Sequence, residues 1–142
     1  MYILRKHKVV EIFYEDTQEI LGFSPEFFVS WLSKVCEEEG FELGDLNLIF
    51  CSDEYLLDMN QQYLEHDYYT DIITFDYCEG KLAKGDLFVS VDRVKDNAIS
   101  ENVTFTKELC RVVVHGVLHL LGYKDKSNEE AITMRGLEDK YV

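Results

Sequence analysis

The stretch from Phe105 to Leu121 constrains the fold most, because it is apolar on almost every side of a helix. Valine and leucine recur throughout it, so we predict a long, buried, central helix. One face differs, where polar residues step by three or four positions: Glu108, Arg111, His115 and His119. A polar stripe on a buried helix must face a cleft, a metal ion or hydrogen-bonding partners.

His115 and His119 lie four residues apart, so both imidazoles can point at one ion. The chain holds only four histidines, and two of them fall in this helix. Gly122 can end the helix and turn the chain, after which Asp125 can supply a third ligand. Three protein ligands with one open position are typical of a catalytic metal site. The alternatives are a hydrogen-bonded pair of core histidines and an aspartate that only serves a turn or a helix cap.

Gly116 stands where a metalloprotease of the H-E-x-x-H type carries its general base. The missing glutamate argues strongly against hydrolysis of a peptide by that route. A bound metal would have to do most of the activation, by lowering the pKa of a water molecule or by polarising a phosphoryl oxygen. The pattern therefore favours hydrolysis of a phosphodiester over attack on an amide.

The composition suits a single compact domain, which we predict to span residues 1–142. The net charge of −14 argues against a general nucleic-acid-binding protein, since such proteins neutralise phosphates with lysine and arginine. It leaves room for a local basic patch or a bound cation. The four cysteines form no C-x-x-C pair and no signal peptide is recognisable, which indicates free thiols in the cytoplasm. We expect no membrane span, because no apolar run reaches about 18 residues.

Strand and helix signals indicate a compact α/β or α+β body. We expect strands at 9–14, 45–51, 71–77 and 85–91, with the last two joined as a hairpin. We expect helices at 25–40, 52–64, 92–99, 105–121 and 128–141. The last helix has a mixed face and is interpreted as a packing element.

Several motifs together resemble those of the YbeY endoribonucleases, a family of ribosomal RNA maturation factors. Residues 115–123 match the family's H-G-x-L-H-L-x-G-Y-D-H motif through its tyrosine. Upstream, Asn60-x-x-Tyr63 and the segments 70–75 and 85–90 resemble its N-x-x-Y, T-D-V-L-S-F and G-D-I-x-I-S elements. The motifs occur in the family's order, and the resemblance covers roughly residues 44–142.

The resemblance implies a single-strand-specific, metal-dependent endoribonuclease of the cytoplasm, which processes the 3′ end of small-subunit ribosomal RNA and serves ribosome maturation and quality control. It implies an α/β (α+β) fold with a small mixed sheet of about four strands, helices around it and a zincin-like metal-binding helix. The expected cofactor is one Zn²⁺ ion on His115, His119 and Asp125. The expected partners are single-stranded ribosomal RNA and the small ribosomal subunit.

Two positions depart from the family pattern. The family's third histidine falls on Asp125, a harder ligand that leaves manganese, nickel or iron more open as the bound metal. The family's arginine falls on Leu64, although an arginine there could hold an RNA phosphate or stabilise its charge. Arg111 is a candidate catalytic substitute, with pairing to Glu108 or another acid as the alternative. His66 is a candidate substrate-binding substitute, with an ordinary loop residue as the alternative.

Further substrate contacts are expected from Tyr63 and Lys124. Stacking on unpaired bases is a common way of holding single strands, and the candidates for it are Tyr63, Tyr68, Tyr69 and Tyr123, with a place in the core as the alternative for half of them. Asp71 and Asp86 each precede an apolar strand stretch, and we expect both to structure the floor of the cleft rather than to bind metal.

Two other functions compete with the metal-dependent nuclease. One is a ribosome-assembly or RNA-binding factor whose metal is structural and which cleaves little or not at all. The missing arginine and the acidic charge favour it. The other is a metallohydrolase that acts on a small phosphorylated substrate.

Overall fold

The computed structural model describes residues 9–66 and 68–142 of the chain. Residues 1–8 of the predicted domain, and Asp67 between the second predicted helix and the third predicted strand, lie outside the described residues. The described residues form four strands and five helices: β1 (Val10–Tyr14), α1 (Pro25–Glu38), β2 (Glu42–Cys51), α2 (Asp53–Leu64), β3 (Ile72–Asp76), β4 (Leu82–Ser90), α3 (Val91–Glu101), α4 (Phe105–Leu120) and α5 (Asn128–Tyr141). The expected α+β fold is confirmed. None of these helices combines the length and apolarity that crossing a membrane requires.

The strands form one mixed sheet in the order β1-β2-β4-β3. β2 pairs in parallel with both β1 and β4, whereas β3 and β4 form the predicted antiparallel hairpin. Two strands begin earlier than predicted, β2 at Glu42 and β4 at Leu82. These two added ends pair with each other, a contact between distant segments that the local sequence does not reveal.

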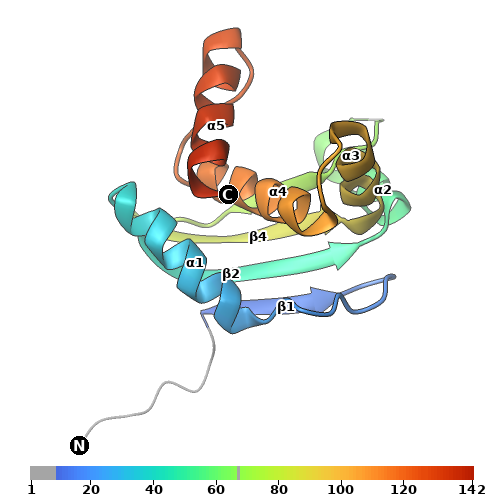
Figure 1. Cartoon of the computed structure of the whole chain (residues 1–142), viewed down its shortest axis with the longest axis horizontal. Helices are drawn as coiled ribbons and strands as arrows, with labels where there is room; N and C mark the ends of the chain where they lie inside the picture. Colours follow the sequence, from blue (N-terminus) through green and yellow to red (C-terminus); the bar gives the residue numbers. More distant parts are fainter. Residues whose placement is uncertain (1–8, 67) are drawn as a thin grey trace, which may run out of the picture.

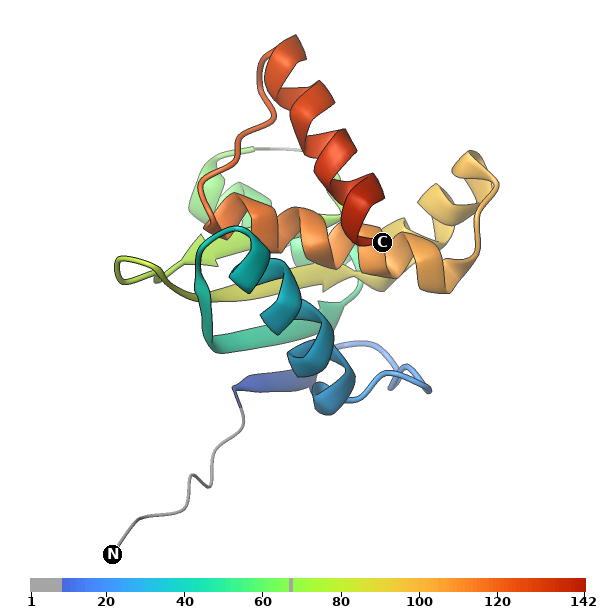
Figure 2. The same ribbon diagram turned by 60° about the vertical axis from the view of Figure 1, so that its left-hand side comes forward.

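The helices cover the two faces of the sheet unequally. α1 and α4 lie on one face (Figures 1 and 2) and build the main core with the strands, through side chains such as Phe28, Leu87 and Leu118. α2 lies on the opposite face, where Leu56 packs on Ile73 in a small second core. α5 packs on α4 on the side away from the sheet (Figure 1). α4 is thus enclosed between the sheet and α5, as its apolar sequence predicts.

Gly116 allows α4 to approach the sheet closely. A Cβ atom placed on Gly116 would lie 2.5 Å from Cδ1 of Ile72 on β3 and 3.2 Å from Cδ2 of Leu87 on β4. No ordinary side chain fits that space without movement of its neighbours. Packing therefore disfavours a larger residue after His115, and a glutamate there would require Ile72 and Leu87 to move.

Serine and threonine side chains begin all five of the described helices. Each accepts a hydrogen bond from the backbone N–H three residues later, which satisfies an otherwise unpaired donor of the first turn. The five N-cap residues are Ser24, Ser52, Ser90, Thr104 and Ser127. Ser127 also forms a capping box with Glu130, so α5 begins sharply just after the loop that carries Asp125.

Candidate metal centre

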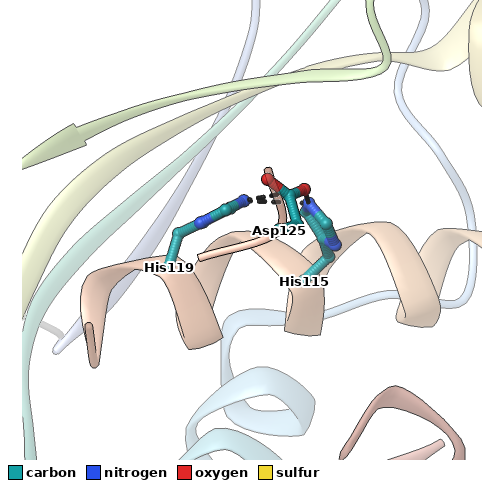
Figure 3. Close-up of side chains that lie close together, drawn as sticks. All are labelled: His115, His119 and Asp125. Carbon is teal, nitrogen blue, oxygen red and sulfur yellow. Dashed lines mark hydrogen bonds and ion pairs between the residues drawn. The ribbon is translucent and has the colours of Figure 1, made fainter. Parts of the chain in front are cut away.

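Three side chains predicted to bind metal lie together at the C-terminal end of α4. His115 and His119 project from successive turns, and Asp125 returns from the following loop to face them (Figure 3). The two Nε2 atoms are 3.0 Å apart, and Oδ2 of Asp125 lies 3.2 Å from Nε2 of His115 and 3.4 Å from that of His119. Gly122 makes this return feasible, because its φ of +104° lies in the left-handed region that favours glycine.

The spacing of these three atoms fits a tetrahedral transition metal. Tetrahedral bonds of about 2.0–2.1 Å place neighbouring ligand atoms about 3.3 Å apart. The three measured separations of 3.0, 3.2 and 3.4 Å lie around that value. Such an ion would keep a fourth position facing the solvent, since all three side chains are partly exposed. The group can therefore hold a metal ion with one open position.

The other nitrogen of each imidazole is already occupied. Nδ1 of His115 lies 2.7 Å from Oε2 of Glu138, and Nδ1 of His119 lies 2.9 Å from the backbone oxygen of Tyr123. Both partners accept hydrogen bonds, so each neutral imidazole carries its proton on Nδ1 and presents the Nε2 lone pair to the centre. Tyr123 is fixed in turn, because its hydroxyl donates to Glu39 at 2.6 Å. Both histidines are thus oriented for ligation before any ion binds.

The interpretation of α5 as a packing element was incomplete, because it missed Glu138. This carboxylate is 5% exposed and contacts both His115 and Arg111. In the sequence, the burial of Glu138 is indicated only by its position four residues after Met134, the other buried residue of α5. An acid on the buried side of a helix needs a partner, but the helix alone does not reveal which one.

Charges around His115 and Glu138 reinforce each other. Burial alone would lower the pKa of His115, but the hydrogen bond and charge of Glu138, aided by Asp71 and Asp125, raise it above its ordinary value. Burial alone would raise the pKa of Glu138, but His115 and Arg111 lower it below its ordinary value. Glu138 is therefore ionised at neutral pH and places a negative charge behind His115.

The polar stripe of α4 faces a cleft of about 650 Å³, which is one of the three surroundings that the sequence left open. Glu108, Arg111, His115 and His119 all line it. The remaining walls come from described residues between Leu64 and Thr74, from the C-terminal half of α3 and from α5. The three candidate ligands thus lie in an accessible cleft and not in a closed core.

Arg111 lies in the cleft wall but is surrounded by acids. Its guanidinium is 3.1 Å from Glu138, 3.0 Å from Asp139 and 3.9 Å from Glu108. The residue is only 9% exposed. This is the pairing with nearby acids that the sequence left open beside a catalytic role, and it makes Arg111 the residue that holds Glu138 in place.

The structure brings only one of the predicted substrate-binding residues into this cleft. His66 lines it, with its ring stacked on Tyr68 at a centroid distance of 5.1 Å. Tyr63 instead lines a separate pocket with Phe75 and Phe88, near the small core under α2. Lys124 is exposed in the loop before Asp125 and is not one of the residues that line the cleft in the described part of the chain.

The two aspartates expected at the cleft floor point to different places. Asp71 lines the cleft, accepts a hydrogen bond from Asn97 at 3.2 Å, and has its pKa raised by burial. Asp86 lines the pocket of Tyr63 and accepts a hydrogen bond from Asn47 at 2.9 Å. The expectation was wrong for Asp86, because it stands opposite Phe75, four residues further along β3 than Asp71, where α2 and its small core border the sheet.

Comparisons with known proteins agree with the motifs. A family model described as Endoribonuclease YbeY matches residues 13–142. A curated relative named Endoribonuclease YbeY, from Cytophaga hutchinsonii, is 52% identical over 136 residues, which cover 94% of each chain. Another with that name, from Flavobacterium johnsoniae, is 53% identical over 115 residues, covering 81% of this chain and 83% of the relative.

A solved structure supports the fold as well. The solution structure of TM1509 from Thermotoga maritima superimposes with a TM-score of 0.59 at 30% sequence identity, over 93% of this chain and 85% of that chain. The fold is thus shared across most of both proteins. Together with the family match over residues 13–142, these likenesses place the chain in the YbeY endoribonuclease family.

Proposed function

We propose that this protein is a metal-dependent endoribonuclease that cleaves single-stranded RNA in the cleft along α4. The observation that carries the proposal is the set of two imidazoles and one carboxylate whose ligand atoms lie 3.0 to 3.4 Å apart in that cleft. The names of the relatives support the same activity.

His115, His119 and Asp125 are the proposed ligands of one Zn²⁺ ion. When bound, a divalent ion supplies Lewis-acid polarisation of a phosphoryl oxygen and lowers the pKa of water. Glu138 and the backbone oxygen of Tyr123 orient the imidazoles through Nδ1. The carboxylate ligand keeps manganese, nickel and iron open as alternatives to zinc.

The substrate is proposed to be an unpaired strand rather than a duplex. Tyr68 lines the cleft and is 55% exposed, and its neighbour Tyr69 is 47% exposed. Exposed aromatic rings bind unpaired bases by stacking, whereas the bases of a duplex are already stacked on each other. His66, stacked on Tyr68, extends this platform into the cleft.

The natural substrate is proposed to be the 3′ end of small-subunit ribosomal RNA, cleaved in the cytoplasm during maturation of the small ribosomal subunit. This finer assignment rests on the family to which the chain belongs. It fits an acidic protein, because a net charge of −14 disfavours indiscriminate binding of nucleic acid and leaves recognition to one local site.

A second candidate function is an RNA-binding assembly factor whose metal is structural. Leu64 favours this function, because it lies on the cleft wall at the position where the family pattern has an arginine that could hold an RNA phosphate. Such a factor would bind single-stranded RNA without cutting it.

The deciding experiment incubates metal-reconstituted protein with labelled single-stranded RNA and with the matching duplex. Metal-dependent cleavage of the single strand supports the nuclease, and binding without cleavage supports the assembly factor. Neither binding nor cleavage would leave a small phosphorylated substrate as the remaining function. Chelator-treated protein and the His115→Ala variant, purified in parallel, control for a contaminating nuclease.

A further inference from the structure

The cleft is acidic even though its proposed substrate is a polyanion. Among the residues that the structure describes, five carboxylates line it, from Asp71, Glu101, Glu108, Asp125 and Glu138. Against them stand two guanidinium groups, those of Arg111 and Arg135, and three histidines. A metal ion can neutralise the scissile phosphate, but a neighbouring phosphate of the strand needs a cation supplied by the protein.

Arg111 cannot supply that cation without losing its present partners. It is 9% exposed, and two carboxylates lie within 3.1 Å of its guanidinium. Turning it toward a phosphate would leave Glu138 without its arginine partner in a buried position, which is energetically costly. The phosphate contact is therefore left to Arg135, the other arginine among the described residues that line the cleft.

Arg135 is available for such a contact. Its side chain is 52% exposed at the cleft wall formed by α5. Its guanidinium lies 3.6 Å from Glu138 and 3.9 Å from Glu101, both longer than a hydrogen bond. Its donors are thus attracted to the cleft by two acids but are not held by either at hydrogen-bonding distance. A phosphate oxygen could take their place at small cost.

Glu138 lies between Arg135 and His115. Oε1 of Glu138 lies 3.6 Å from Nη1 of Arg135, and Oε2 of the same carboxylate lies 2.7 Å from Nδ1 of His115. One side chain therefore separates the guanidinium from the first metal-ligating histidine. Arg135 and the candidate metal ligands line the same cleft, so a strand whose scissile phosphate lies at the histidines can bring a neighbouring phosphate to the guanidinium. A planar guanidinium suits two phosphate oxygens at once.

We propose that Arg135 is the phosphate-binding residue of the cleft and that it holds RNA by the phosphate adjacent to the cleavage site. This proposal rests on the proposed function, because it requires RNA in the cleft. The contact is made equally in the bound substrate and during cleavage. Its loss therefore raises KM and leaves kcat nearly unchanged.

The test measures binding of a single-stranded oligonucleotide made resistant to cleavage by 2′-O-methyl groups. Arg135→Gln is compared with Lys140→Gln, which removes the same charge from an exposed position of the same helix, away from the residues that line the cleft. Arg135→Gln should bind about tenfold more weakly, the size of one charged hydrogen-bonding contact. Its slope of log affinity against log salt should be shallower by about 0.7, the value for one phosphate of a single strand. Lys140→Gln should match the parent on both measures, and Arg135→Lys should fall between the parent and Arg135→Gln.

Cleavage kinetics on unmodified RNA test the role of Arg135 separately from the proposed nuclease function. A raised KM with nearly unchanged kcat in Arg135→Gln supports the assignment. If the parent cleaves single-stranded RNA and Arg135→Gln binds and cleaves like Lys140→Gln, Arg135 is only a surface residue and the proposal is overturned while the nuclease stands. If the parent neither binds nor cleaves single-stranded RNA, the proposed function fails and this assignment fails with it.

Discussion

Glu138 reaches across from α5 and accepts a hydrogen bond from Nδ1 of His115 at 2.7 Å, 23 residues away in the sequence. The contact links the last helix of the described fold to the central one. It fixes the ring orientation of His115 and makes the opposite nitrogen a stronger base, as carboxylates behind metal-bound histidines do. Because Arg111 holds the other oxygen of Glu138, the carboxylate cannot turn away.

Replacing Glu138 by Gln should weaken metal binding by about 10–100-fold, the usual effect of losing a partner behind a ligand. The amide oxygen can still accept the hydrogen bond, but it brings no negative charge to the imidazole. Competition with a chelator dye measures the affinity. Asp139→Asn is the matched control, because Asp139 also pairs with Arg111 but is 60% exposed and belongs to the solvent side of the pair. Equal losses in both variants would mean that only the charge of α5 matters.

His115→Ala and His119→Ala should each abolish stoichiometric metal binding, because each removes a direct ligand. The loss should exceed the roughly 10–100-fold expected for Glu138→Gln. The protein should stay folded, since both side chains are partly exposed at the cleft and lie outside the apolar core. Elemental analysis gives the metal content and circular dichroism the helix content. Full metal content in both variants would remove these histidines from the site.

Gly116→Ala should destabilise the fold by about 1–3 kcal/mol, the usual cost of overpacking a core. The reason is the 2.5 Å approach of the added Cβ to Cδ1 of Ile72. Ile72→Val removes that Cδ1 atom, so the double variant should recover part of the loss. Denaturant unfolding of the parent, both single variants and the double variant gives the coupling.

A second glycine provides the control for that experiment. Gly136 lies inside α5, and an added Cβ there would have nothing within 4 Å. Gly136→Ala should therefore stabilise the protein by roughly 0.5–1 kcal/mol through helix propensity alone. Destabilisation by both alanines would show that backbone conformation, and not the contact with Ile72, decides the effect at Gly116.

The central helix could be predicted because the pattern that defines it lies within one continuous stretch of sequence. A run of valine and leucine with one polar stripe defines α4 almost to the residue, and the spacing of His115 and His119 needs only the helical repeat. The position of Asp125 could also be predicted from nearby residues, since Gly122 turns the chain between His119 and Asp125. The expectation of an RNA substrate comes from the resemblance to the family, because the periodicity of apolar residues carries no information about the substrate.

Features that depend on packing between distant segments could not be predicted. Glu138 joins the site only because of the way α5 packs on α4, and its own helix shows a mixed pattern. Tyr63 and Leu64 are neighbours in sequence but line different pockets, because they point to different sides of α2. Asp86 was misplaced for the same kind of reason, since the pocket that a strand residue lines depends on which helix covers that part of the sheet.

Glu108 should make the stability of the protein depend on pH. Burial raises the pKa of its carboxyl, and one of its buried oxygens has no hydrogen-bond partner within the described structure. The folded protein then keeps this proton at a pH where the unfolded chain, with an ordinary value of about 4.3, has lost it. Stability therefore falls as the pH rises from the unfolded pKa through the folded pKa.

Glu108→Gln removes this titrating proton, and with it the part of the loss of stability at rising pH that Glu108 causes. The variant should match the parent near pH 4 and be more stable by about 1 kcal/mol at pH 8, the scale of one buried polar group. Asp71, whose pKa is also raised by burial, titrates in both proteins, so the difference between the two curves isolates Glu108. Denaturant unfolding across this range provides the curves. Parallel curves would show that Glu108 is ionised in the folded state at the same pH as in the unfolded chain.

We predict that Asp125 influences which metal the proposed site prefers. Its Oδ2 lies 3.2 and 3.4 Å from the two Nε2 atoms, so it completes the ligand triangle. Asp125→Ala should weaken binding of Zn²⁺ by more than the 10–100-fold lost with an orienting partner, since a direct ligand goes. Asp125→His replaces a hard oxygen by an imidazole and should retain Zn²⁺ while reducing the affinity for Mn²⁺ relative to Zn²⁺. Competitive titrations with both metals measure the ratio. Zn²⁺ affinity that is unchanged in Asp125→Ala would make Asp125 a turn residue and leave only the two histidines as ligands.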